Sequence, residues 1–396
     1  MKVLLVTGEY PPKQGGVGDY THELGKALLA LGVEADALTS GEEVSPLTDA
    51  ALPSPGEPRV LRPVARWGWT CLPLILKQVR EARPDVLHIQ YQTAAFAMRP
   101  AINFLPWWTR KRLGQAAPRT VATFHDVKVP YLFPKAGPLR WWITLWLART
   151  SEATIVTNVE DQQQLAPYRW RRTPYLIPIG SNIAPHLPAG YDRDQQRARW
   201  GFIPEDIVLC YFGFLNESKG GEALIRVLDR LVKSGYNSHL LMIGGKVGSS
   251  DPTNIAYAQH IDALVEASGL AERVRRTGFS EASEVSANLV ASDICLLPYR
   301  DGASFRRGSF MAALAHGRPI VSTQPRVPIP QLVDGENIAL APPDDIAKLA
   351  ARVEELIKNP QHREALGKGA QELSRSFGWD EIARQTVEVY RDLGAT

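Results

Sequence analysis

The stretch from Leu296 to Thr323 reads LLPYRDGASFRRGSFMAALAHGRPIVST, and it decides the fold class of this chain. Its pattern predicts a buried strand, a loop, a short helix over 309–315 and a second strand over 319–322. The loop therefore lies at the carboxyl end of a strand and at the amino end of a helix. Open α/β sheets bind ligands at such places, because free backbone N–H groups and the helix dipole favour an anion. Arg306 and Arg307 add two positive charges, so we expect a phosphate-bearing substrate there.

Predicted strands and helices alternate on both sides of this stretch, in two similar halves. Each half opens with a buried strand, a glycine-bearing loop and an amphipathic helix. Such alternation implies parallel sheets with crossover helices, and so an α/β fold with two doubly wound, Rossmann-like domains. The predicted strands lie at 3–7, 34–38, 86–90, 120–124 and 154–157 in the first half, and at 207–213, 239–243, 275–278, 294–297, 319–322 and 337–340 in the second.

The predicted domain boundary lies in a stretch that contains Pro185, Pro188 and Gly190. Residues 1–185 then form the first domain and residues 186–378 the second. The last segment, 379–396, carries apolar residues at helical spacing and needs a surface to cover.

Charge, cysteine content and the length of apolar runs restrict the location and the class of protein that the chain can be. The net charge is +3, but residues 1–185 hold 21 Lys and Arg against 15 Asp and Glu, whereas residues 186–396 hold 24 against 27. The three cysteines match no metal spacing and no disulfide framework, which favours a reducing, cytoplasmic location. We expect no signal peptide and no membrane span, because the apolar runs are too short.

Several segments, in this order, resemble those of retaining glycosyltransferases with the GT-B fold, in the glycosyltransferase group 1 or family 4 class. Each piece is a weak match, but their order and spacing are specific and span nearly the whole chain. The pieces are PPKQGGVGDYTHELGKALLALG, DVLHIQYQ, TFHDVKVP, LIPIGSNI, FGFLNESKGGEALIRVL, VRRTGFS, ASDICLLPYRDGASFRRGSFMAALAHGRPIVST and FGWDEIARQTVEVYRDL.

The resemblance implies a hexosyl- or glycosyltransferase of the EC 2.4 type. Residues 1–185 would bind the acceptor, residues 186–378 would bind a nucleotide diphosphate sugar in the cleft between the domains, and the helix in 379–396 would pack back on the first domain. The chain also departs from the family pattern, in which two glutamates contact the donor sugar and the ribose. Ser304 and Ala312 stand at those positions, and Phe214 stands where an arginine is usual.

The donor phosphates are expected at Lys219, Arg306 and Arg307, because cations aimed at the leaving oxygen stabilise the transition state. The resemblance adds the turn at Gly15 and Gly16, although a tight strand-to-helix connection explains these glycines equally well. For the donor sugar, the candidates are Ser304 and Asp301, which stand near the missing glutamate. Asp301-Gly302 reads equally well as a turn.

His125 and Asp126 follow a predicted strand, and the resemblance makes them the catalytic candidates. Asp126 reads equally as a cap of the next segment. Gly278 and Phe279 would bind the base through backbone groups. We expect no metal, since cations replace it, and no other cofactor. A glycosidase needs two carboxylates placed as acid and nucleophile, and the sequence shows no such pair.

Nine basic residues and one acidic residue occur from Arg99 to Arg149, together with five tryptophans. Such segments bind the headgroup region of anionic membranes, which predicts a peripheral protein on the inner membrane face. The alternative is that the stretch 138–149 is a core helix. Nucleic acid is not expected, because the basic residues follow no reading motif.

The leading hypothesis is therefore an enzyme that moves a sugar, with retention, to a lipid-linked sugar, a polysaccharide or another glycan. Loss of both glutamates leaves a second hypothesis, a non-catalytic GT-B protein that acts as a nucleotide-binding or scaffold subunit. A third, a GT-B sugar epimerase, should show more carboxylates near the substrate.

Overall fold

The computed structural model describes the chain except for residues 14, 42–53, 128–136, 182, 246–251 and 396. It divides into two compact units. Unit 1 comprises Met1–Asn182 and Phe377–Thr396, and unit 2 comprises Ile183–Ser376. The last helix thus belongs to the same unit as the first strand, and the chain crosses between the units twice.

Unit 1 is built on a seven-stranded parallel sheet with the order β3-β2-β1-β4-β5-β6-β7. Its inner strands are apolar runs buried on both faces, as parallel sheets require. The strands are β1 (Lys2–Thr7), β2 (Glu34–Ser40), β3 (Arg59–Val64), β4 (Val86–Tyr91), β5 (Arg119–Phe124), β6 (Ala153–Val156) and β7 (Tyr175–Leu176).

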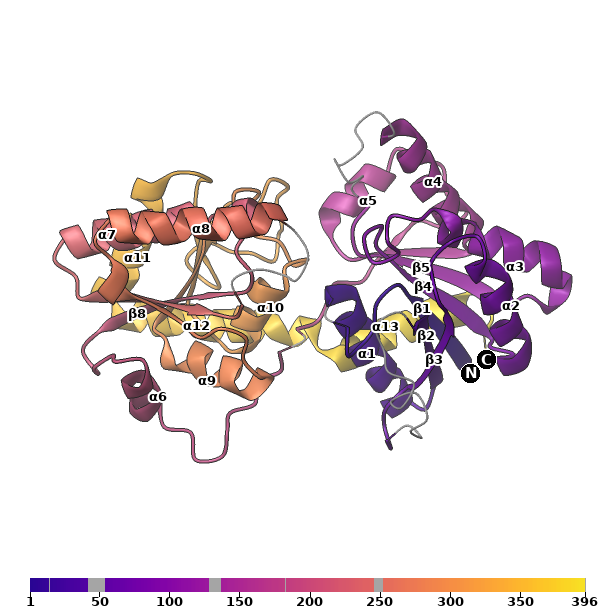
Figure 1. The fold of residues 1–396 in the computed structure, drawn as a ribbon, viewed down its shortest axis with the longest axis horizontal. Coiled ribbons are helices and arrows are strands. Elements are labelled where there is room, and N and C mark those ends of the chain that lie inside the picture. Colours follow the sequence, from indigo (N-terminus) through magenta and orange to yellow (C-terminus); the bar gives the residue numbers. More distant parts are fainter. Residues whose placement is uncertain (14, 42–53, 128–136, 182, 246–251, 396) are drawn as a thin grey trace. The chain divides into compact units, whose positions relative to one another are not determined.

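Helices cover both faces of this sheet. Alternate residues of β1 enter two separate cores: Val3 and Leu5 belong to one, Leu4 and Val6 to the other. The core that contains Val3 also includes residues of α1 and α13, which lie side by side (Figure 1). The helices of unit 1 are α1 (Gly16–Ala30), α2 (Cys71–Ala82), η1 (Ala101–Phe104), α3 (Leu105–Leu113), η2 (Gly114–Ala116), α4 (Gly137–Thr150), α5 (Val159–Leu165) and α13 (Trp379–Asp392).

Unit 2 has a six-stranded parallel sheet with the order β10-β9-β8-β11-β12-β13. Its strands are β8 (Ile207–Phe212), β9 (Ser238–Ile243), β10 (Val274–Arg276), β11 (Ile294–Leu297), β12 (Ile320–Thr323) and β13 (Ala339–Ala341). Its helices are α6 (Arg193–Arg199), η4 (Glu217–Lys219), α7 (Gly221–Lys233), α8 (Pro252–Ala267), η5 (Ala271–Arg273), α9 (Ala282–Ala291), α10 (Gly308–Ala315), α11 (Ile346–Lys358), α12 (Pro360–Ser374) and η6 (Arg375–Phe377), which reaches into unit 1.

The strand order reverses between β1 and β4 in unit 1 and between β8 and β11 in unit 2. Doubly wound sheets bind ligands beyond the carboxyl ends of the strands at such a reversal. The predicted fold class is confirmed, but two strands were not predicted. β3 contains two arginines and a proline, and β7 has only two residues, so neither has the apolar run that marked the others.

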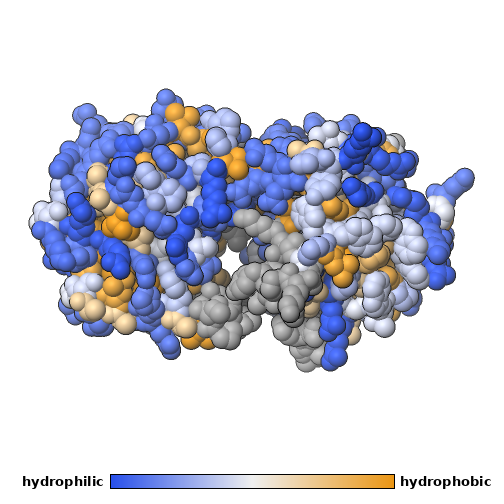
Figure 2. All heavy atoms as spheres, turned by 90° about the horizontal axis from the view of Figure 1, so that it is seen from above, coloured by the Kyte–Doolittle hydropathy of each residue, from blue (hydrophilic) through white to orange (hydrophobic). Residues whose placement is uncertain are grey.

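The molecular surface in Figure 2 is mainly hydrophilic, with small hydrophobic groups between the charged ones. Among the described residues, no helix is long and apolar enough to cross a membrane. A single exposed apolar side chain is ordinary on such a surface, so only groups of them indicate a contact surface.

Candidate functional site

In unit 2, the loops that follow β8 and β11 meet at the strand-order reversal. A methyl group placed on Gly213, just after β8, would lie 3.2 Å from Lys219 Nζ and 3.7 Å from Ser309 Cβ. Lys219 stands two residues before α7, and Ser309 lies in the first turn of α10. Two helix amino ends and one ammonium group therefore border the same point, an arrangement that favours an anion.

Gly220 connects Lys219 to α7 in a way that other residues cannot. Its φ is +73°, and a Cβ there would lie 1.9 Å from the carbonyl oxygen of Pro298. The chain thus approaches the end of β11 at a distance that only glycine allows. This close approach brings the start of α7 next to the loop after β11.

The ammonium group of Lys219 is held in an unusual environment. Burial, together with the nearby charge of Arg307, lowers the pKa of Lys219 to about 8. In the described part of the chain, no carboxylate pairs with its Nζ. Lys219 is half-buried, and a partly desolvated cation without a counter-ion is unfavourable, so an anion bound here would stabilise the charged form.

The two arginines of the loop after β11 share one carboxylate. Arg306 Nη2 lies 2.7 Å from Asp301 Oδ2, and Arg307 Nη2 donates to Asp301 Oδ1. Burial alone would raise the pKa of Asp301, but the charges of Arg307 and Arg306 outweigh it and hold that pKa below its usual value. Asp301 is therefore a counter-ion of the arginine pair, and its expected contact with a donor sugar stays a prediction.

Arg307 is further fixed by an aromatic ring. Its guanidinium carbon lies 4.4 Å from the centre of the Tyr299 ring, and its Nε is enclosed without a hydrogen-bond partner. The Tyr299 hydroxyl lies 2.7 Å from Ser309 Oγ. Ser309 does not cap α10, because Arg307 holds the cap position and makes no side-chain cap bond. The hydroxyl of Ser309 bonds Tyr299 instead.

The other candidates of unit 2 lie on the same sheet edge. Ser304 is buried and accepts the N–H of Arg306 at 3.5 Å. Ala312 is fully buried within α10. Gly278 and Phe279 follow β10 rather than end it, and the Phe279 ring is 70% exposed. Their role toward a nucleotide base remains a prediction.

In unit 1, His125 follows β5 and is oriented by a chain of buried polar groups. Its Nε2 lies 2.9 Å from Gln90 Oε1, and Gln90 Nε2 lies 3.2 Å from His88 Nε2. His88 Nε2 also lies 2.7 Å from Thr123 Oγ1. His88 Nδ1 lies 2.6 Å from the hydroxyl of Tyr390, in α13. His125 therefore donates to Gln90 through Nε2 and keeps Nδ1 as an acceptor.

Burial lowers the pKa of His125 to about 3, so the ring is neutral at ordinary pH. The Tyr20 ring packs edge-on against it, with the centroids 4.5 Å apart. A neutral, fixed imidazole is suited to hydrogen bonding with a sugar hydroxyl rather than to general base catalysis, which needs a pKa nearer the working pH. Asp126, the next residue, is half-buried.

The turn at Gly15 and Gly16 already holds a carboxylate. Glu9 Oε1 accepts the N–H of Val17 at 3.1 Å, and a Cβ on Gly15 would lie 2.2 Å from the Glu9 carboxyl group. Gly15 thus makes room for Glu9. Burial raises the pKa of Glu9 despite these N–H contacts. A phosphate at this turn would compete with Glu9, so phosphate binding by Gly15 and Gly16 stays a prediction.

Unit 1 contains a pocket of about 180 Å³ on the sheet face that α4 covers. His125 does not line it: its backbone N–H donates to the carbonyl oxygen of Tyr91 at 3.0 Å, but its ring packs against Tyr20, which belongs to the core on the other face. The pocket lies between α4 and the segment after β4, and both Arg99 and Arg140 line it. Its other lining residues are Tyr91, Thr93, Met98, Pro100, Asn103, Leu139, Ile143 and Thr144.

Aromatic side chains gather on the surface beside this pocket. The rings of Trp69, Phe104, Trp146 and Trp142 form a continuous row, with successive centroids 5.4, 6.0 and 5.4 Å apart. Trp69 is 60% exposed and Trp142 is 47% exposed. We call these four residues the aromatic row.

The remaining tryptophans of the basic stretch divide between core and surface. Trp141 donates to the Tyr168 hydroxyl at 2.7 Å, and both Trp141 and Trp108 pack against the core of unit 1. Trp107 is 38% exposed, with Lys111 over its ring. Helix α4 is therefore neither a wholly buried helix nor a wholly exposed one. Lys128 and Lys135, counted in the basic stretch, lie outside the described residues.

Three residues of these sites were not predicted. Gln90 orients His125, Tyr299 holds Arg307 and Ser309, and Glu9 occupies the α1 turn. Each follows or ends a strand at the ligand-binding edge, which was the available signal. In the described residues, no three His, Cys, Asp or Glu side chains group as a metal site would require, and the expectation that no metal is needed stays a prediction.

Comparisons with known sequences divide the chain in the same way as the structure. Residues 14–183 match the family model described as Glycosyltransferase Family 4, and residues 206–359 match the model described as Glycosyl transferases group 1. A D-inositol 3-phosphate glycosyltransferase of Corynebacterium diphtheriae is 27% identical over 222 residues, which cover 55% of this chain but only 50% of the relative. The glycogen synthase of Mycobacterium tuberculosis is 25% identical over 98% of this chain and 94% of its own length.

Solved structures show the same fold over the whole length. The sucrose-phosphate synthase of Thermosynechococcus elongatus superposes with a TM-score of 0.77 at 21% identity, and covers 100% of this chain and 99% of its own. Anabaena HepE, solved in complex with UDP and glucose, has a TM-score of 0.77 at 18% identity over 99% of this chain and 100% of its own. The two family matches, over residues 14–183 and 206–359, and the GT-B fold over the whole length thus make the chain similar to the glycosyltransferases of the group 1 and family 4 class.

Proposed function

We propose that this protein is a retaining glycosyltransferase that takes a sugar from a nucleotide diphosphate donor. The observation that carries the proposal is Lys219, a half-buried lysine at the amino ends of α7 and α10 whose ammonium group has no carboxylate partner among the described residues. A diphosphate would supply the missing negative charge. As the glycosidic bond breaks, charge grows on the leaving phosphate oxygen, and a preorganised cation stabilises it more than it stabilises the ground state.

Arg307 is the second phosphate ligand in this proposal. Its enclosed Nε has no partner, and the Tyr299 ring holds the guanidinium in place. Asp301 balances part of the charge of the arginine pair, so Lys219 carries most of the unbalanced positive charge. The solved complex of Anabaena HepE with UDP-glucose supports a donor of this type for the same fold.

We propose that retention proceeds without a covalent bond to a protein carboxylate. A double displacement through a protein carboxylate needs a free Asp or Glu beside the anomeric carbon. Asp301 is engaged by two arginines, and Glu9 is engaged by the amino end of α1. We therefore infer that the departing phosphate itself accepts the acceptor proton on the same face of the sugar, while His125 Nδ1 accepts a hydrogen bond from a sugar hydroxyl.

The acceptor is proposed to bind the pocket between α4 and the segment after β4, which combines apolar side chains with Arg99 and Arg140. That combination suits a lipid-linked acceptor with a phosphate group. The aromatic row, Trp107 and the excess of basic residues in unit 1 would hold a membrane surface next to the pocket. A curated relative, the phosphatidylinositol monomannoside mannosyltransferase of Mycolicibacterium smegmatis, is named for a lipid acceptor.

A second candidate function is a nucleotide-binding subunit without activity. The observation that favours it is the pair Ser304 and Ala312, both buried and neither acidic. No carboxylate stands at those two positions to bind the donor sugar or the ribose.

Donor binding and turnover separate the two functions. The purified chain is titrated by calorimetry with UDP, GDP and ADP, and then incubated with the corresponding labelled sugar nucleotides and a bacterial lipid extract. Transfer that retains the anomeric configuration supports the enzyme. Binding without release of nucleotide or transfer of sugar from any donor supports the subunit. If none of the three nucleotides binds at millimolar concentration, the donor site itself is refuted.

A further inference from the structure

Unit 2 has a pocket at the edge of its sheet opposite to the edge that carries Lys219. Asp293 directly precedes β11 and Pro319 directly precedes β12, so both mark the amino ends of these strands. Four residues of β11, roughly 13 Å of extended chain, separate this edge from the loop that carries Arg307. The pocket measures about 390 Å³ and is lined by Arg193, Asp293, His316, Gly317, Arg318, Pro319, Pro360, Arg363, Glu364, Gly367, Lys368 and Gln371.

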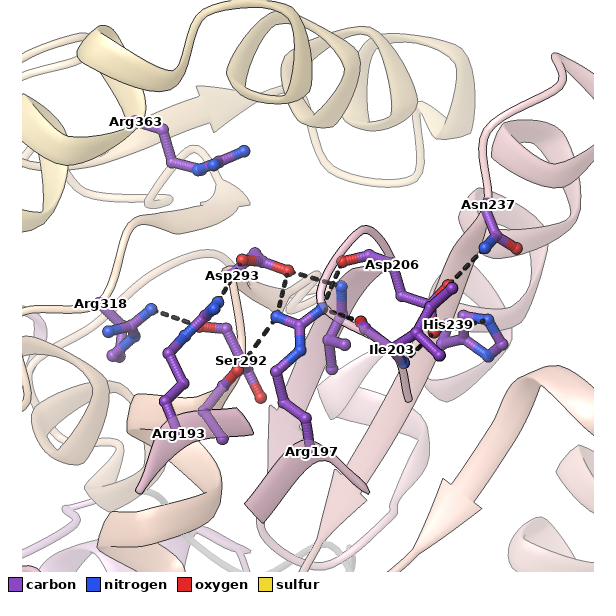
Figure 3. Close-up of polar contacts among 12 residues, drawn as sticks. Arg193, Arg197, Ile203, Asp206, Asn237, His239, Ser292, Asp293, Arg318 and Arg363 are labelled. Atoms are coloured by element: carbon purple, nitrogen blue, oxygen red, sulfur yellow. Dashed lines mark hydrogen bonds and ion pairs between the residues drawn. The ribbon is translucent and has the colours of Figure 1, made fainter. Parts of the chain in front are cut away.

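Two carboxylates, Asp293 and Glu364, line this pocket among the described residues, and both have partners. Asp293 Oδ1 lies 2.7 Å from Arg193 Nη2, and its Oδ2 lies 3.2 Å from Nη1 of the fully buried Arg197 (Figure 3). Glu364 lies 2.6 Å from Lys368 Nζ at the exposed rim. Both negative charges are thus balanced before Arg318 and Arg363 are counted.

Arg318 is a mostly buried cation without a carboxylate of its own. Its Nη2 donates to the carbonyl oxygen of Ser292, and its Nε is shielded from solvent with no hydrogen-bond partner. Burial lowers the pKa of Arg318 from its usual value, yet a guanidinium stays charged. A structural arginine at such a place normally faces a carboxylate, as Arg197 faces Asp293.

Arg363 reaches the same pocket from another helix. It comes from the first turn of α12, and its Nη1 donates to the carbonyl oxygen of Leu356 at 3.3 Å, with no carboxylate partner among the described residues. In Figure 3 no contact joins it to the network around Asp293. Two guanidinium groups from different elements therefore line one pocket with an excess of two positive charges.

His316 does not alter this balance. Its Nδ1 lies 2.7 Å from the carbonyl oxygen of Ala312, and its Nε2 lies 2.8 Å from Ser286 Oγ. Both ring nitrogens are occupied, and burial lowers the pKa of His316, so the ring is neutral.

We propose that this pocket is a second anion site of unit 2 and binds a small phosphomonoester. A phosphate group accepts hydrogen bonds from two guanidinium forks at once, and the pocket is larger than a bare phosphate requires, which leaves room for a small organic body such as a sugar. The proposal does not depend on the donor site, because it rests on residues at the other edge of the sheet.

Calorimetry on the full chain at constant ionic strength tests the site, with inorganic phosphate and glucose 6-phosphate as probes. Both should bind to the wild type and to Lys219→Ala, since the donor site is not involved. Arg363→Gln should weaken binding about tenfold, because it removes a charge-assisted contact. Arg318→Gln should weaken it at least as much if that variant folds, as circular dichroism will show.

Arg375→Gln is the matched control, because it removes one exposed arginine just beyond α12 and outside the pocket. It should bind the probes as the wild type does. The proposal is overturned by any of three results: no binding of either probe to the wild type, equal binding to Arg363→Gln, or loss of binding in Lys219→Ala. The last result would assign the probes to the donor site.

Discussion

The hydroxyl oxygen of Tyr390 lies 2.6 Å from Nδ1 of His88, although 302 residues separate the two in the chain. Tyr390 belongs to α13, which ends the chain, and His88 to β4, in the middle of the unit 1 sheet. Through Gln90, this contact continues to His125. The end of the chain thus helps to fix the orientation of the proposed catalytic imidazole.

Tyr390→Phe should lower the free energy of unfolding of unit 1 by about 1–3 kcal/mol, because it leaves the buried N–H of His88 without an acceptor. Tyr175→Phe serves as the control, since its exposed hydroxyl bonds Asp392 near the end of the same helix, and it should cost less than about 0.5 kcal/mol. Urea denaturation measures both. Equal losses in the two variants would contradict the role assigned to the buried contact.

Binding of a nucleotide diphosphate should weaken as the pH rises above about 8. Burial and Arg307 depress the pKa of Lys219 to about 8, so the free protein loses this positive charge above that pH, not below it. The association constant for UDP should therefore fall by up to about tenfold per pH unit above 8. Lys219→Arg, which stays charged, should give a flat profile from pH 7 to 9.5. A flat profile in the wild type would show that Lys219 does not contact the ligand.

Asp301→Asn should tighten UDP binding about three- to tenfold at low salt, because it removes a negative charge that now balances Arg306 and Arg307. The gain should shrink in 0.5 M salt. Asp334→Asn, which breaks the pair with Arg352 elsewhere in unit 2, provides the control. Weaker UDP binding in Asp301→Asn would mean that the carboxylate is needed to hold the arginines in place.

His125→Ala should lower kcat about a hundredfold with little change in UDP affinity, because the proposed role of the imidazole is a contact with the sugar and not with the phosphates. Gln90→Leu should lower kcat less, since it only frees the ring to rotate. In neither the wild type nor Gln90→Leu should kcat change between pH 5 and 8 through titration of His125, because burial lowers the pKa of His125 to about 3.

His22→Gln, which changes a half-buried histidine of α1 paired with Glu57, is the control for these assays. A rate that rises with a pKa near 6.5 in the wild type, and is lost in His125→Ala, would contradict a neutral hydrogen-bonding role.

Vesicles with anionic lipid should bind the chain, and salt should weaken the binding. Trp107→Ala/Trp142→Ala should bind less in flotation assays, because both rings are exposed. Trp108 is not a suitable target, since it packs against the core. Leu187→Ala, an exposed apolar residue of unit 2, should have no effect. A wild-type chain that stays unbound at low salt would refute membrane docking.

The sequence by itself determined the fold class and the edge of each sheet where ligands should bind. Apolar runs separated by amphipathic helices allow only parallel, doubly wound sheets. Such local signals located eleven strands within a few residues, from Val3 to Leu340. They missed β3 and β7, where arginine, proline and short length remove the apolar run. Lys219, expected at the donor phosphates, directly precedes Gly220-Gly221, which is also a local signal.

Only the tertiary structure decided how the candidate residues are used. Asp301 pairs with both arginines, Ser309 bonds Tyr299, and Glu9 fills the turn at Gly15. Nor could spacing reveal the contact between Tyr390 and His88, or the pocket that brings Arg318 and Arg363 together. Local pattern specifies which residues form an element, whereas partners and burial depend on which elements pack together, and the charge state of Lys219 or His125 follows from that burial.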